Sequence, residues 1–318
     1  MVPPARRPAG CPGGRRPGLR PPAPFPARRL ARRPGWVPRA AKERPDSSAA
    51  PARAGPRPTK KETLADQTGP DAGDPPVQPG VVTRSVPFGF SRVVFLSHVI
   101  DTATPVFPGD PPVEIRPAAV IQQDGYYLQS LTFGEQAGTH WAAPAHFHAG
   151  QRSADELDPG DFFRPAVVLD VRVAAARDAD FALGVPQIRR WEATFGPIPP
   201  GSAVIMWTGF EDRWDDPAAY LNSDSAGRLH YPGFGAEAAR WLIDQRSIGV
   251  LGIDTMGIDP GTDTSYAANQ LLLQDHRLHL ENLCGLNQMP PMGGWIIIGG
   301  LRIRAGSGSP ATVFGLIP

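Results

Sequence analysis

The sequence predicts a single α/β domain preceded by a disordered tail. Composition changes sharply near residue 80, and from Arg92 onward short apolar runs of strand length alternate with helical patterns. No internal repeat and no Gly-x-Gly-x-x-Gly fingerprint occurs, so a nucleotide-binding architecture is not indicated. We therefore expect residues 1–86 to be a Pro/Arg-rich extension and residues 87–318 to form the folded domain.

The tail is set apart by its proline content and its charge. Residues 1–80 hold 19 of the 39 prolines and 16 basic against 6 acidic residues, whereas residues 81–318 carry a net charge of −9. Such a segment buries too little apolar surface to offset the entropy of ordering it. A cationic arm for nucleic acid and a transit peptide are two interpretations. A dispensable extension, such as an over-long reading of a GC-rich gene, is favoured, and no nucleic-acid partner is expected.

Compartment and membrane association follow from two further observations. No apolar run reaches the roughly 20 residues of a membrane-spanning helix, and no signal peptide is evident. Cys11 lies in the tail and Cys284 in the domain, which gives no disulfide framework. We expect a cytoplasmic protein without a membrane partner.

Eight segments carry the pattern of strands. They are apolar or alternating runs bounded by glycine, proline and other turn residues. In chain order they are Arg92–Ile100, Tyr126–Phe133, Ala166–Val171, Ala203–Trp207, Ile248–Ile253, Trp295–Ile298, Leu301–Ile303 and Thr312–Leu316. Between the first two, the proline-rich stretch from Asp101 to Pro112 predicts an irregular loop.

Three segments carry helical signals. Pro186 opens a helix through Trp191, because proline suits the first helical turn. Residues 236–245 place Ala239, Leu242 and Ile243 on one face, and residues 267–274 follow a glycine-rich turn.

One segment has the composition of a site rather than of a core element. Two histidines stand six residues apart, the first directly after a Gly-Thr turn and the second two residues after a proline, in the run Glu135-Gln-Ala-Gly-Thr-His-Trp-Ala-Ala-Pro-Ala-His146. It resembles the signature His-x-Gly-Thr-His-x-Asp-x-Pro-x-His of the cyclase family, which includes bacterial kynurenine formamidases and isatin hydrolases. The match covers Gly138, Thr139, His140, Pro144 and His146, and it fails at Gln136 and Ala142.

Four further segments resemble that family in the right order. They are Leu96-Ser-His98 with Pro108-Gly-Asp-Pro111, Gly252–Thr255 with Ile258–Thr262, Glu281-Asn-Leu283 with Gly285–Pro290, and Gly306–Pro310. The resemblance implies a compact α/β/β fold with a central mixed, barrel-like sheet flanked by helices. It also implies a homodimer or larger homo-oligomer.

The resemblance implies a metal centre that is depleted in this sequence. Metal-dependent members hold one ion between the first two signature histidines and the aspartate, which bridges to a second ion shared with a downstream histidine and the glutamate of Glu-Asn-Leu. His140 and Glu281 remain, and Gln136 offers an amide oxygen, a weaker zinc ligand than imidazole. Ala142 and Asn269 stand at the aspartate and downstream histidine positions. We expect at most one divalent ion, zinc or manganese, or none.

Two arrangements could replace the lost centre. A relocated single-ion site could use His140, Glu281 and one of three other histidines, at 148, 276 or 279. Alternatively, His140 and His146 could act as acid and base without a metal, with Glu281 orienting one of them, because imidazole titrates near neutral pH. In both cases His146 keeps the proton-shuttle role that the resemblance implies.

Candidate substrate contacts are His98, Phe107, Trp141 and Asp254. Each has a structural alternative, since aromatic side chains often fill cores and an aspartate in a glycine-rich loop often caps a turn. Tyr126 and Tyr127 are further candidates for an aromatic pocket wall, and Cys284 is expected to pack rather than to react.

Together these features predict an arylformamidase-like hydrolase that uses a small, aromatic formamide, cyclic amide or lactone, as in tryptophan catabolism. Two alternatives stay open: a metal-independent cyclase or lyase of specialised metabolism using two histidines, and a ligand-binding protein without turnover. The sequence does not choose the substrate.

Overall fold

The computed structural model describes residues 89–318, so the expectations for the tail lie outside the described residues. Its centre is a nine-stranded mixed sheet in the order β1-β13-β11-β5-β7-β9-β10-β4-β12. The strands are β1 Arg92–Phe95, β4 His140–Ala142, β5 Phe163–Asp170, β7 Ala203–Trp207, β9 Val250–Ile253, β10 Leu278–Glu281, β11 Gly294–Ile298, β12 Gly308–Pro310 and β13 Val313–Ile317.

Within residues 89–318, six helices and two small sheets complete the fold. The helices are α1 Ile121–Asp124, α2 Arg172–Ala175, α3 Val185–Phe195, α4 Pro217–Leu221, α5 Ala236–Arg246 and α6 Ala267–Leu272. The small sheets pair β2 Glu114–Ala119 with β3 Leu128–Thr132, and β6 Ala182–Leu183 with β8 Gly233–Phe234. Four short 3₁₀ turns lie at Pro144–His146, Pro159–Phe162, Phe210–Arg213 and Leu286–Gln288.

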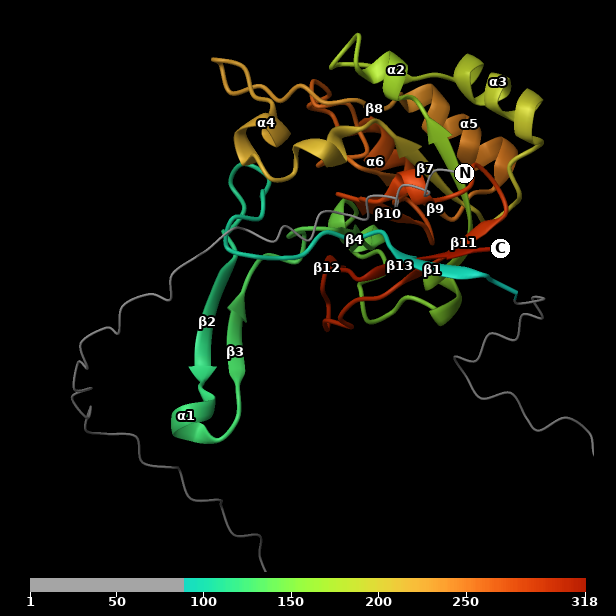
Figure 1. The fold of residues 1–318 in the computed structure, drawn as a ribbon. Coiled ribbons are helices and arrows are strands. Elements are labelled where there is room, and N and C mark those ends of the chain that lie inside the picture. Colours follow the sequence, from blue (N-terminus) through green and yellow to red (C-terminus); the bar gives the residue numbers. More distant parts are fainter. Residues whose placement is uncertain (1–88) are drawn as a thin grey trace, which may run out of the picture. The chain divides into compact units, whose positions relative to one another are not determined.

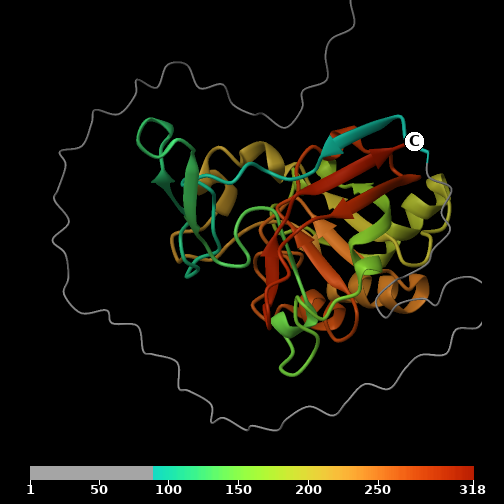
Figure 2. The same ribbon diagram turned by 90° about the horizontal axis from the view of Figure 1, so that it is seen from below.

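The middle of the large sheet is parallel and its flanks are antiparallel. Strands β5, β7, β9 and β10 run parallel to one another. At the two ends of this block, β11 pairs antiparallel with β5 and β4 pairs antiparallel with β10. Near-continuous apolar sequence suits strands buried on both faces, as in Ala203–Trp207. The sheet curls into a half-barrel, which confirms the predicted α/β class and mixed, barrel-like sheet (Figures 1 and 2).

The two faces of the sheet build two apolar cores. On the outer face, alternate residues of β5, β7 and β9 pack against α3, α5 and α6 through Ile188, Leu242 and Leu272. On the inner face, the complementary residues of the same strands pack across the curl with β1, β11 and β13. Successive strand residues point to opposite faces, so each position is committed to one core or the other.

A two-stranded arm stands away from this body. Figures 1 and 2 show β2 and β3 projecting from the sheet with α1 at the tip, and every residue of β3 is exposed. The strand expected over residues 126–133 therefore exists in part, but it does not run directly into the signature, because residues 133–139 form a turn before β4. Tyr126 and Tyr127 are each 57% exposed and belong to this arm.

Most predicted elements are present with shifted ends. The first strand ends at Phe95 rather than residue 100, and the helix from Val185 runs to Phe195. The strand expected at Leu301–Ile303 is wrong, since these residues form a loop before β12. Within residues 89–318 no helix is long and apolar enough to cross a membrane. One chain is described, so the expected homo-oligomer stays a prediction.

Candidate active site

The signature and the Glu-Asn-Leu segment meet as neighbouring strands. Strand β4 pairs antiparallel with β10, with His140 opposite Glu281 and Ala142 opposite His279. Side chains alternate along each strand, so these four positions share one face of the sheet. Leu280 and Trp141, the residues between them, belong to the inner core. The shared face is the outer one, where α6 also packs, because Ala142 and the α6 residue Leu272 belong to the same outer core.

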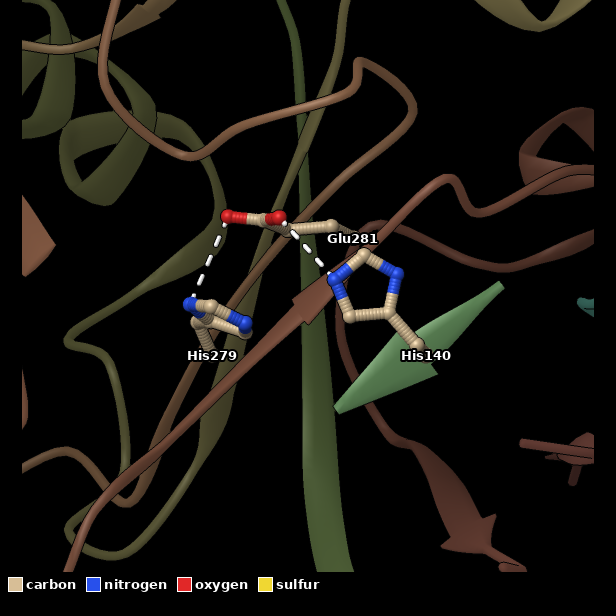
Figure 3. Close-up of side chains that lie close together, drawn as sticks. All are labelled: His140, His279 and Glu281. Carbon is tan, nitrogen blue, oxygen red and sulfur yellow. Dashed lines mark ion pairs between the residues drawn. The ribbon is translucent and has the colours of Figure 1, made fainter. Parts of the chain in front are cut away.

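A buried carboxylate lies between two imidazoles on this face (Figure 3). His140 Nε2 is 3.2 Å from Glu281 Oε2, and His279 Nδ1 is 3.4 Å from Glu281 Oε1. All three residues are at most 5% exposed. The three donor atoms lie within 4.8 Å of one another, close enough to share one cation.

The residues of the Gly-Thr turn and of the Glu-Asn-Leu segment fix the ring of His140. His140 Nδ1 is 2.9 Å from the carbonyl oxygen of Gly138, which sits at a φ of +65° that favours glycine. Asn282 Nδ2 donates to the same carbonyl at 2.8 Å, and Thr139 Oγ1 donates to the Asn282 carbonyl at 2.5 Å. The Gly-Thr turn and the Asn of Glu-Asn-Leu therefore act together to orient one imidazole.

Asn269 and Asp259 fix the second imidazole. Asp259 accepts hydrogen bonds from the backbone N–H groups of Ala268 and Asn269 at the start of α6, and from Asn269 Nδ2 at 2.8 Å. The amide nitrogen of Asn269 is thereby turned to Asp259, so its oxygen faces His279 Nδ1 at 2.6 Å. Because an amide oxygen only accepts, His279 Nδ1 donates to it, and this hydrogen bond orients the ring.

A separate chain of hydrogen bonds reaches His146. The Ser307 hydroxyl donates to Glu135 Oε2 at 2.6 Å and accepts from Gln136 Nε2 at 3.1 Å. Gln136 Nε2 also lies 3.5 Å from His146 Nδ1. The amide of Gln136 thus faces His146 with its donor, which leaves the Gln136 oxygen buried and without a partner.

Burial and neighbouring charge set the protonation of the cluster. Burial lowers the pKa of His279 to about 3, against the attraction of the Glu281 charge, so this imidazole is neutral. Burial opposes ionisation of Glu281, but His279, His140 and the Ile258 N–H lower its pKa to about 2. Packing around the His146 ring also lowers its pKa, with Glu281 opposing. The site holds a buried anion near two imidazoles, those of His146 and His279, whose lowered pKa values favour the neutral, proton-accepting form.

The cluster lines a cavity of about 650 Å³, within the usual range for small-molecule sites. The other walls are mainly apolar and aromatic. They include Phe107, Phe147, Leu229, Tyr231, Met256 and Tyr266, with Asp110 and Arg228 also on the lining. The cavity could enclose a small, flat aromatic molecule with a polar group directed at the histidines.

The predicted site residues separate into those at the cavity and those away from it. His140, His146, Glu281, Gln136 and Phe107 line the cavity. Trp141 does not: it is 1% exposed and points into the inner core, because it alternates with His140 along β4. There it contacts Phe162 edge to face, with 5.0 Å between ring centroids.

His98 and Asp254 also lie outside the cavity lining. The His98 ring stacks on Trp214 with 3.8 Å between centroids. The Asp254 carboxylate accepts from the backbone N–H groups of Thr208 and Gly209, at 2.8 and 2.7 Å, and so closes the turn after β7. For Asp254 the geometry matches the turn-capping alternative.

The two-ion centre implied by the signature does not fit these residues. Ala142 has no donor, and the Asn269 amide is engaged by Asp259 and His279. Of the alternative histidines, His148 lies off the cluster, because it follows the 3₁₀ turn at residues 144–146 and its Nε2 is 2.9 Å from the Gln270 carbonyl oxygen. His276 is outside the cluster as well, and only His279 joins His140 and Glu281.

His279 could have been singled out from the sequence. The run Leu278-His-Leu-Glu281 alternates apolar and polar residues, which indicates a strand with His279 and Glu281 on one face. The cavity residues Phe147, Tyr231 and Tyr266 carry no such signal, because they come from separate loops that only the fold brings together.

Comparison with known proteins agrees with this geometry. A family model described as "Putative cyclase" matches residues 94–260. The chain belongs to this family. An isatin hydrolase from Roseibium aggregatum is 32% identical over 247 residues, covering 72% of this chain and 93% of that protein.

More distant relatives and a solved structure extend the likeness. A kynurenine formamidase from Sphingopyxis alaskensis is 25% identical, covering 69% of this chain and 95% of its own length. The structure of isatin hydrolase A from Ralstonia solanacearum superimposes with a TM-score of 0.68 at 32% identity, covering 71% of this chain and 92% of that one. The described part of the chain therefore has the fold of cyclase-family hydrolases of small aromatic amides.

Proposed function

We propose that this protein hydrolyses a small aromatic cyclic amide, opening the ring to an aromatic amino acid or amine that carries a new carboxylate. The observation that carries the proposal is the aromatic cavity ending on His140, His146, His279 and Glu281. The isatin hydrolase that is 32% identical acts, by its name, on an aromatic lactam, which supports the choice of a cyclic amide over an open-chain formamide.

The walls of the cavity suit the aromatic half of such a substrate. Phe107, Phe147, Tyr231 and Tyr266 line it, and aromatic faces stack on flat rings with favourable dispersion. Burial of the ring in this cavity directs the polar amide toward the histidines on the lining, His140, His146 and His279. Binding energy from the ring thereby positions the carbonyl carbon for attack.

His146 is the proton-transfer residue in this proposal. Water adds to the amide carbonyl, the C–N bond breaks, and the nitrogen leaves with a proton delivered by the imidazole, which the attacking water restores. The Gln136 amide holds the His146 ring through Nδ1, so Nε2 is left to exchange protons with substrate. A divalent ion held by His140, His279 and Glu281 would polarise the carbonyl and acidify the water.

A substrate panel tests the proposal. The full chain is incubated, with zinc or manganese present and then with a chelator, with isatin, an N-formyl aromatic amine and an aromatic lactone, and products are followed by chromatography. We expect the lactam to be opened fastest. His146→Ala should lower kcat by about 100-fold or more, as loss of a general acid–base typically does.

The matched control is His148→Ala, which removes an imidazole two residues away that lies outside the cluster. It should leave the rate within about twofold of the parent. Failure of all three substrates under both conditions would favour the ligand-binding alternative. Undiminished turnover of the lactam by His146→Ala would show that the proton-transfer assignment is wrong.

A further inference from the structure

We infer that His140, His279 and Glu281 form a single-zinc site, in which the ligand missing at Ala142 has been replaced from the neighbouring strand by His279. This inference deepens the proposed function, because it names the ion that the same site would hold. It differs from the two-ion centre implied by the signature in both ligand identity and ion count.

The hydrogen bonds of His140 point to a cation beside Nε2. The Gly138 carbonyl oxygen, 2.9 Å from Nδ1, can only accept, so Nδ1 carries the proton of the ring. Nε2 lies 3.2 Å from a Glu281 oxygen, so this nitrogen and this oxygen border a space that one cation could share. A backbone carbonyl behind the ring is also the usual partner of a metal-binding histidine.

The hydrogen bonds of His279 leave its other ring nitrogen available. Its Nδ1 faces two acceptors, the Glu281 carboxylate at 3.4 Å and the Asn269 amide oxygen at 2.6 Å, so Nδ1 carries the proton. Its Nε2 is buried and has no partner, although the residue is only 1% exposed. Among the described residues three buried side-chain atoms lack a partner, and two of them, His279 Nε2 and Gln136 Oε1, belong to residues that line this cavity.

The spacing and the donor types favour zinc. With bond lengths of about 2.0 to 2.2 Å, two ligands of one tetrahedral zinc stand about 3.3 to 3.6 Å apart. His140 Nε2 and Glu281 Oε2 stand 3.2 Å apart, and His279 has a ring nitrogen within 4.8 Å of the other two ligand atoms. Two imidazoles and a carboxylate are a ligand set of catalytic zinc sites, which keep a fourth position for water or substrate.

The register of β4 and β10 explains how the site is built. Positions 140, 142, 279 and 281 make a square on one face of the sheet, with 142 directly opposite 279. Cross-strand Cβ atoms in such pairs are about 5 Å apart, so a donor at either position reaches the same space. Ala142 supplies only a methyl group, and His279 occupies the position across from it. The third ligand therefore comes from the neighbouring strand β10 and not from β4 itself.

Zinc binding by the purified full chain tests the inference. Metal is removed with a chelator, the chelator is exchanged away, and bound zinc is measured by elemental analysis and by competition with a chromophoric chelator. The parent should bind one zinc per chain. His279→Ala should bind at least about 100-fold more weakly, because even residues behind the ligands cost 10- to 100-fold.

Two further variants keep the result interpretable. His148→Ala, which removes a histidine outside the cluster, should bind zinc like the parent. Ala142→Asp combined with His279→Ala returns a donor to the opposite strand and should recover at least about tenfold of the lost affinity. Circular dichroism of each variant checks folding, and if His279→Ala does not fold, His279→Gln takes its place.

Four results would overturn the inference: less than a tenth of an equivalent of zinc on the parent, two equivalents, unchanged affinity in His279→Ala, or no recovery in the double variant. None of these depends on turnover. A chain that opens the lactam in chelator without binding zinc would keep the proposed function and lose the zinc site. A chain that binds zinc but opens no substrate would keep the zinc site and lose the proposed function.

Discussion

Asn282 links the two signature segments, and its removal should be costly. Its side chain donates to the Gly138 carbonyl at 2.8 Å and accepts from the Tyr220 hydroxyl at 2.7 Å, with all these contacts buried. It also adopts a φ of +57°, which asparagine tolerates better than alanine. Loss of the Gly138 bond costs about 1 kcal/mol, and loss of the Tyr220 acceptor about 1 kcal/mol. The left-handed backbone adds about 1 kcal/mol for alanine.

We therefore expect Asn282→Ala to lower the free energy of unfolding by about 3 kcal/mol. Guanidinium denaturation followed by far-ultraviolet circular dichroism measures this difference. The comparison requires that the unfolding free energy of parent and variant depends on denaturant concentration with the same slope. Asn282→Gly removes the same hydrogen bonds without the backbone strain and should cost less than alanine. A loss below about 1 kcal/mol for Asn282→Ala would refute the role assigned to these contacts.

Two other predictions concern pH and substrate binding. Burial, together with the nearby Asp254 charge, raises the pKa of Glu211 from its ordinary 4.5 to about 7. The folded state thus holds this proton more tightly than the unfolded chain, so its contribution is full below about pH 4.5 and is lost as pH rises through 7. In Glu211→Gln, denaturation midpoints between pH 5 and 8 should fall less with pH than in the parent, and an equal slope would contradict this assignment. Phe107→Ala, which opens one cavity wall, should raise KM for an aromatic lactam by about tenfold with little change in kcat, since partial exposure of a ring costs about 1.4 kcal/mol; a selective loss of kcat would argue that Phe107 acts on the reacting group instead.

The fold was predictable from the sequence where strands are long and apolar. The run Ala203–Trp207 matches β7 residue for residue, and the helix from Ala236 differs from α5 by one position. The strands that carry the site were missed, because β4 has three residues and β10 carries His279 and Glu281. A short strand that buries polar side chains contains no continuous apolar run, so a search for apolar runs does not find it.

The candidate site was predictable only as far as local motifs extend. The signature identified His140 and His146, and the Glu-Asn-Leu segment identified Glu281, all of which line one cavity. Trp141 was predicted at the cavity but lies in the inner core. Side chains alternate along β4, so Trp141 points to the other face of the sheet from His140. The cross-strand pairing of Ala142 with His279 is set by register between segments about 140 residues apart, and no local pattern reports it.

The central claim is that the face shared by β4 and β10 catalyses addition of water to an aromatic lactam. Turnover of isatin in ¹⁸O-labelled water, with the product masses measured by mass spectrometry, tests it most directly. We expect a ring-opened carboxylate that carries one labelled oxygen and forms at least about 100-fold faster with the parent than with His146→Ala. A product without label, or equal rates for the two proteins, would contradict it.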